Sequence, residues 1–199
     1  MPRSSAGVRA AQLNPLGGSL QFLAIVGLSI AAAVIYGIVH DQITVRICLE
    51  YFTIGHPPIF STSSPTLLAL AWGVVATWWV GLILGLGLAT ASRVGVRRPI
   101  EARELVRPIG TLLAVMAVGA LLSGGLVAIL AARGNLSLWE PLASLIPAES
   151  HNGFLTDLGA HSASYLIGGV GGLVLMFRVW HRRLRELPPN KSLERTREG

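Results

Sequence analysis

Residues 67–92 read LLALAWGVVATWWVGLILGLGLATAS, and this stretch contains no ionisable side chain. A helix needs about 20 mainly apolar residues to cross a hydrocarbon core about 30 Å thick. The stretch therefore predicts a membrane-spanning helix. Three further runs of similar character carry at most one or two ionisable residues, near their ends. We expect four spans, at residues 20–39, 67–90, 109–132 and 160–180.

The composition supports a membrane protein over a soluble one. Only 13% of the 199 residues are charged, whereas 52% are hydrophobic; soluble domains carry roughly 25% charged residues. So many apolar side chains also exclude a disordered chain. We predict an all-α membrane protein with one four-helix transmembrane domain at 1–185 and a disordered cytoplasmic tail at 186–199. The single cysteine, Cys48, excludes an intramolecular disulfide.

The basic residues predict the orientation. The chain has a formal net charge of +6, but its arginines cluster beside apolar runs and do not alternate with aromatic residues, so we expect no nucleic-acid partner. Fourteen of the sixteen Lys and Arg residues lie before the first span, between the second and third, or at and beyond the end of the fourth, where Arg178 stands; the others are Arg46 and Arg133. Positive residues concentrate on the cytoplasmic side. We therefore expect cytoplasmic termini and arginines that contact anionic lipid headgroups.

The segments predicted to lie outside, 40–66 and 133–161, hold four of the five histidines together with several acids. Imidazole and carboxylate groups suit zinc or another divalent first-row metal. The sequence has no HExxH pattern, and the two segments join different helix pairs, so the absence of any cofactor is the alternative. The candidate metal ligands are His40, Asp41, Glu50, His56, Glu149, His151, Asp157 and His161.

Three of the polar residues that lead into the fourth span share one helical face. Asp157, His161 and Ser164 stand at positions i, i+4 and i+7. These are the residue types of a nucleophilic triad, but side chains on one helix face converge poorly, and neither a G-x-S-x-G turn nor an oxyanion-hole donor is identifiable. We favour a structural or hydrogen-bonding role, with a metal or proton-handling site as the alternative.

The first outer segment shows a strand-like alternation. Residues 43–51 read ITVRICLEY, so every second residue is apolar or aromatic. Period two with β-branched residues favours an extended, strand-like loop. Such a loop could act as a lid or a docking element for a partner, or it could be a connector that rests on the membrane surface.

Small residues recur at a spacing of four within two spans. Gly81 and Gly85 form one GxxxG pattern, and Gly168 and Gly172 form another. This pattern allows helix backbones to approach closely. Packing within the chain is one use, and a homo-oligomer through these faces is the other.

Three segments carry a resemblance to a known group of proteins. They read HDQITVR at 40–46, EYFTIGHPP at 50–58 and AHSASY at 160–165. In these segments the chain resembles uncharacterised bacterial integral membrane proteins of similar length. The resemblance implies a bacterial inner-membrane location and brings no assigned activity.

Three functions fit these observations. The first is a non-enzymatic scaffold, assembly or envelope-associated factor that acts through its outer loops. The second is a small oligomeric transport component, and the third is a metal-dependent membrane enzyme that uses the outer His, Asp and Glu residues. No predicted span has an ionisable residue near its middle, which disfavours a pump. With no catalytic motif present, the sequence favours the first function.

Overall fold

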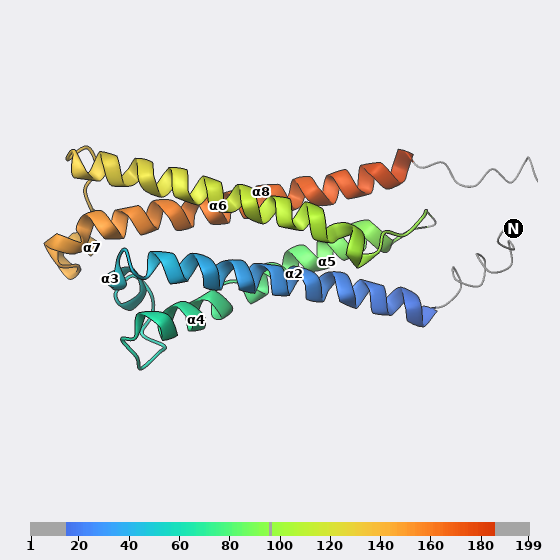
Figure 1. Ribbon diagram of the computed structural model, residues 1–199, viewed down its shortest axis with the longest axis horizontal. Helices are drawn as coiled ribbons and strands as arrows, with labels where there is room; N and C mark the ends of the chain where they lie inside the picture. The colour runs from blue at the N-terminus through green and yellow to red at the C-terminus, as the bar shows by residue number, and fades with distance from the viewer. Residues whose placement is uncertain (1–14, 96, 186–199) are drawn as a thin grey trace, which may run out of the picture.

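The computed structural model describes residues 15–95 and 97–185, and this part of the chain is helical and contains no β-strand (Figure 1). Four segments are long and apolar enough to cross a membrane, which confirms the predicted four-span architecture. The predicted tail at 186–199 lies outside the described residues. The spans are formed by α2 (Pro15–Thr44), α4 (Pro65–Val75) continued by α5 (Trp78–Arg93), α6 (Ala102–Ala132) and α8 (His151–Arg185).

The short elements gather at one end of the bundle. They are α3 (Leu49–Thr53), α7 (Leu142–Leu145) and the single turn η1 (Ala148–Ser150). We call this the loop end. At the opposite end, α2 begins, α8 ends, and the connection from α5 to α6 turns (Figure 1). Because arginines gather there, we call it the arginine end.

The helices extend beyond the predicted spans at the loop end. The first was expected to end at residue 39 and the fourth to begin at residue 160, but α2 continues to Thr44 and α8 begins at His151. A helix satisfies its backbone hydrogen bonds internally, so it can continue past the apolar core without a partner. Several polar residues predicted to lie in loops or at span boundaries are therefore held on rigid helices.

The strand-like loop predicted for residues 43–51 is wrong. The helical pattern continues through Val45, whose N–H donates to Asp41 O at 2.9 Å, and the chain then turns into α3. The alternation is not kept either, because Val45 is buried while Ile43 and Ile47 are about half exposed. A lone strand would leave a row of backbone groups unpaired, whereas a helical turn pairs them locally.

The bundle consists of two layers that pack against each other. In one layer α6 lies along α8; in the other α2 lies along α4 and α5, and α5 also contacts α8 (Figure 1). The GxxxG face of α5 is used for this packing, since an added Cβ at Gly81 would lie 2.7 Å from Ile30 Cα on α2. Gly172 likewise faces Leu84. These glycines bring helices of the same chain together.

The second span is interrupted where α4 gives way to α5. Ala76 and Thr77 form a turn between the two helices, and Thr77 Oγ1 donates to Gly73 O at 2.5 Å. Gly37 of α2 lies directly against this turn, because an added Cβ there would be 2.7 Å from Gly73 O. Irregular backbone within a membrane is tolerated where protein covers it or where it lines a cavity.

Arg183 holds the arginine end together. Its side chain is only 2% exposed, although the sequence suggests a residue that contacts lipid headgroups. It donates through Nε to Arg98 O at 3.0 Å, through Nη1 to Ala91 O at 2.7 Å and Val94 O at 3.0 Å, and through Nη2 to Arg97 O at 3.3 Å. One guanidinium therefore binds the last turn of α5 and the chain that follows it.

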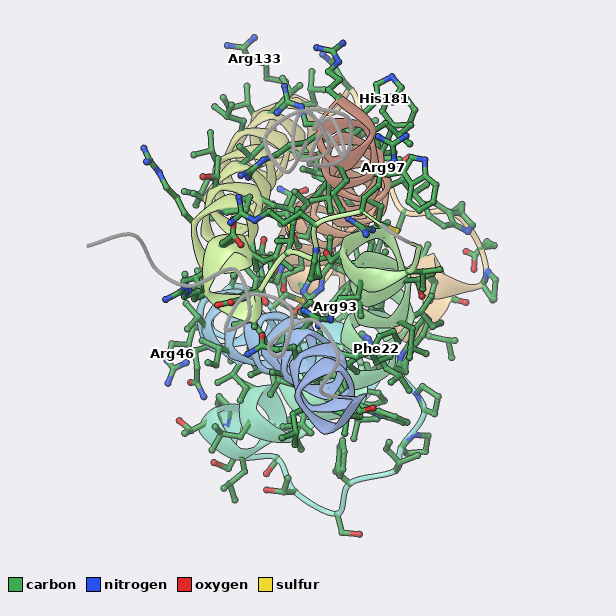
Figure 2. All side chains as sticks on the ribbon, turned by 90° about the vertical axis from the view of Figure 1, so that its right-hand side faces the viewer. Phe22, Arg46, Arg93, Arg97, Arg133 and His181 are labelled. Carbon is green, nitrogen blue, oxygen red and sulfur yellow. The ribbon has the colours of Figure 1, made fainter. Side chains whose placement is uncertain are left out.

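Figure 2 looks onto the arginine end along the bundle. Arg93 lies among the helices there, and its Nη1 donates to Ile100 O at 3.3 Å. His181 extends outwards in the same view. Arginines that were alike in the sequence thus divide into those that support the fold and those that face the surroundings.

Candidate metal centre

Two helices bring three possible metal ligands together at the loop end. His40 and Asp41 are neighbours near the end of α2, and His161 lies on α8. One ligand atom from each lies within 4.8 Å of the other two, and His161 Nε2 is 4.0 Å from Asp41 Oδ1. Both Asp41 and His161 are buried. Two imidazoles and one carboxylate therefore converge from residues far apart in the chain.

Thr44 links the two helices beside this group. Its Oγ1 lies 3.2 Å from His161 Nε2 and donates to His40 O at 3.2 Å, one turn earlier on α2. The threonine is itself buried. This contact ties the imidazole of His161 to α2 through the same ring nitrogen that faces Asp41.

Aromatic rings pack around His161. The Tyr51 ring stacks on it with centroids 4.6 Å apart, and the His40 ring meets it edge-on at 4.5 Å. Phe52 contributes a third ring at 5.8 Å. Because α3 supplies Tyr51 and Phe52, the short helix after α2 covers the site from the loop end.

Several buried polar atoms in this region have no hydrogen-bond partner. They include Nε2 of His40 and both carboxyl oxygens of Asp157, a residue that is fully buried. The N–H of Cys48, which lies near Asp157, is bonded to Thr44 O at 3.1 Å. Buried polar groups are nearly always satisfied by protein, water or an ion. The unpaired His40 nitrogen therefore indicates an available ligand position.

A cavity of about 70 Å³ adjoins the three ligands. Apart from these ligands its lining is mainly apolar and aromatic, with the Tyr36 and Ser164 hydroxyls joined at 2.8 Å. Ala76 and Thr77, which form the break between α4 and α5, also line it. The cavity has room for a few water molecules, since each needs about 10–15 Å³ of such space.

The other predicted ligands divide into neighbours and outliers. His56 lines the same cavity, although its Nδ1 is 2.7 Å from Tyr51 O and its ring lies 4.6 Å from that of Trp72. Asp157 lies one helical turn before His161 and is close enough to Asp41 to interact with it electrostatically. Both stand beside the three ligands without belonging to the group within 4.8 Å.

The outliers are Glu50, Glu149 and His151. Glu50 accepts a hydrogen bond from the Cys48 thiol at 3.4 Å, and His151 Nε2 is 2.9 Å from Ile146 O. Glu149 lies in η1, outside the group of three ligands. The sequence placed all eight residues on one side of the membrane without showing which of them converge.

The hydroxyl of Ser164 is paired with Tyr36. Its partner is therefore a tyrosine on α2, and the described contacts give it no bond to His161. Ser164 and His161 thus each contact a residue of α2, and the arrangement does not have the hydrogen bonds of a nucleophilic triad.

Two groups on the connection after α2 stay neutral. Burial raises the pKa of the Cys48 thiol to about 11, and burial also raises the pKa of the Tyr51 hydroxyl above its ordinary value. A thiol must lose its proton to bind a metal. Cys48 is thus a poor ligand here, and the candidate centre consists of nitrogen and oxygen atoms.

Tyr36, Thr44 and Tyr51 were not among the residues that sequence reasoning placed in the site. Each lies against a candidate histidine: Tyr36 stacks on His40 with centroids 5.7 Å apart, whereas Thr44 and Tyr51 contact His161. Helical spacing from His40 could have suggested Tyr36 and Thr44, which stand one turn away on either side. Tyr51 reaches the site only because the chain folds back after α2.

Comparisons of this chain with protein-family models, with curated proteins and with solved structures each found no match. The chemistry of the site is therefore inferred from its own geometry. Two imidazoles and a carboxylate are ligands that zinc and other divalent first-row metals accept.

Proposed function

We propose that this protein is a multi-pass membrane protein that binds one divalent first-row transition metal ion through His40, Asp41 and His161. One observation carries the proposal: three ligand atoms from two helices lie within 4.8 Å of one another in a buried site. The unpaired Nε2 of His40 adds to it.

The number of protein ligands indicates which role a bound metal ion would have. Three protein ligands leave a coordination position for water or a substrate, as in catalytic rather than structural zinc sites. The adjoining cavity gives that position space. We therefore favour a metal-dependent activity over a purely structural ion. The scaffold role that the sequence favours stays a prediction.

The transport alternative receives less support. The buried ionisable groups near the candidate centre lie at the loop end, whereas a cluster of apolar side chains that includes Ile25, Leu88 and Leu105 fills the bundle towards the arginine end. A path for ions normally carries polar groups through the membrane. In the described part of the chain, the apolar cluster separates the candidate centre from the arginine end.

Metal analysis tests the proposal. The protein, purified in detergent with a tag that lacks histidine, should retain about one equivalent of zinc, iron, manganese, cobalt, nickel or copper by mass spectrometry of the elements. His161→Ala and His40→Gln should each reduce this to less than a tenth, because two remaining ligands hold a divalent ion poorly. The exposed His181, at the arginine end, supplies the control substitution His181→Ala, which should retain the ion.

A metal content that is unchanged in His161→Ala and His40→Gln would overturn the assignment. The assignment would also be overturned if the wild-type protein bound no metal ion after incubation with each of these metals. Since a variant could lose its ion by unfolding, each should also show the wild-type elution volume and helical circular dichroism.

We also propose that the loop end faces outwards from a bacterial inner membrane, with both termini in the cytoplasm. The arginine-rich connection between α5 and α6 and the last turns of α8 lie at the same end, as the positive-inside rule requires. A periplasm-active reporter fused after residue 62 should be active, and one fused after residue 100 should be silent. The reverse pattern would show the opposite orientation.

A further inference from the structure

A groove runs between α6 and α8 in the half of the bundle nearest the arginine end. It has a volume of about 740 Å³, within the range of about 300–1,000 Å³ typical of ligand clefts. Its walls include Val115, Leu166 and Val170, whose side chains are half exposed or more. Apart from Thr111 and two arginines, the lining residues are apolar. The groove therefore opens towards the lipid.

Those two arginines, Arg107 on α6 and Arg178 on α8, line the same groove. The helices are antiparallel, and their register is visible where Gly171 faces Leu112 and Gly119 faces Ile167. The same register places Arg107 level with Arg178. Both guanidiniums therefore belong to one end of the groove, close to where α6 begins and α8 ends.

The neighbouring arginines already have partners. Arg98 and Arg182 both approach Glu104, at 3.8 Å and 3.6 Å, and Arg103 pairs with Glu101 at 2.8 Å. In contrast, the side chains of Arg107 and Arg178 contact no acid within the described residues, and no acid lines the groove. Among the described residues, two positive charges thus face an apolar groove without an acid to balance them.

We propose that this groove binds one anionic phospholipid of the surrounding bilayer. The phosphate lies between Arg107 and Arg178, and an acyl chain occupies the apolar part along Leu112 and Val170. Guanidinium groups bind phosphate oxygens through paired hydrogen bonds, and basic pockets between spans on the cytoplasmic side suit acidic headgroups. The site lies away from the candidate metal centre and does not depend on it.

A lipid fits the groove better than a second copy of the chain does. A two-fold axis along the membrane normal would place the same face of both copies in contact, so Arg107 and Arg178 would meet their own equivalents. Four like charges would then approach without an acid between them. A phospholipid instead supplies the missing negative charge and the apolar chain together.

Lipid binding can be counted by native mass spectrometry of the detergent-solubilised protein. With phosphatidylglycerol and phosphatidylcholine added in equal amounts, we expect one retained phosphatidylglycerol, preferred at least tenfold. Arg107→Gln combined with Arg178→Gln should remove this preference. The control is Arg133→Gln combined with Arg185→Gln, which removes the same charge from two exposed residues outside the groove and should leave the preference intact.

Val170→Trp gives a second, independent test. Val170 is about half exposed on the groove wall, so the larger ring should occupy the acyl-chain position and reduce retention of both lipids while all arginines remain. An unchanged preference in the Arg107→Gln, Arg178→Gln protein would refute the proposal, as would equal loss in the Arg133→Gln, Arg185→Gln control. A dimer that forms in place of the lipid complex would assign the groove to a second copy.

Discussion

The Gly81→Ala protein should unfold at a markedly lower denaturant concentration than the wild type. A Cβ at this position would lie 2.7 Å from Ile30 Cα and 2.8 Å from Ser29 O, and both are backbone atoms that cannot rotate away. The backbones of α2 and α5 would have to move apart at this point. Overpacking of this kind costs about 1–3 kcal/mol. Unfolding in mixed micelles, followed by circular dichroism, measures the loss.

Gly27→Ala provides the matched control. Gly27 is exposed on α2, and an added Cβ there meets nothing within 4 Å. Alanine lowers the conformational entropy of the unfolded chain relative to glycine. This variant should therefore have an unchanged stability or be stabilised by up to about 1 kcal/mol. If both variants unfold alike, the close approach of α2 and α5 at Gly81 does not contribute to stability.

Arg183→Met should destabilise the protein by about 3 kcal/mol or more. Methionine keeps an unbranched apolar stem, but it removes all the hydrogen bonds from Arg183 to the backbone around the end of α5. A hydrogen bond from a charged donor contributes about 1.5–3 kcal/mol, and unpaired buried carbonyls add a penalty. Thermal unfolding in detergent measures the change, and proteolysis should detect an opened 94–101 connection.

Two further variants separate the role of Arg183 from its charge. Arg183→Lys keeps the charge, but a lysine ammonium has three donors on one nitrogen and cannot span the same set of carbonyls, so we expect an intermediate loss. Arg185→Met removes an exposed arginine two residues later and should change stability by less than about 0.5 kcal/mol. Equal losses in Arg183→Met and Arg185→Met would mean that net charge, and not the backbone contacts, stabilises this end.

The apolar runs predicted four long helices correctly because the requirement is local. In lipid, a stretch such as 67–92 must pair its backbone N–H and C=O groups, and a helix pairs them within the stretch itself. The ends of the helices were less predictable. The alternation in 43–51 suggested a strand, yet continuing α2 to Thr44 pairs the backbone at once. A strand would have needed a partner strand, and residues 15–95 and 97–185 form none.

The sequence could indicate which types of side chain the candidate site contains, but not which of the eight candidate residues come together. His40, Asp41 and His161 were among eight candidates from two segments. Their convergence depends on α2 and α8 lying side by side at the loop end, which is a property of helix packing. His151 belonged to the same candidate set, but the turn at its helix start directs its ring to Ile146 O.

The arginines show most clearly which features follow from the sequence and which depend on the tertiary structure. By itself the sequence determined that this is a four-span membrane protein with its basic residues gathered in particular connections, because span length and charge distribution are properties of the chain read in order. Only the tertiary structure decided that Arg183 binds backbone carbonyls while Arg178, on the same helix, lines an apolar groove. The physical reason is that burial, pairing and convergence are set by which helix faces meet, and those contacts join residues far apart in the sequence.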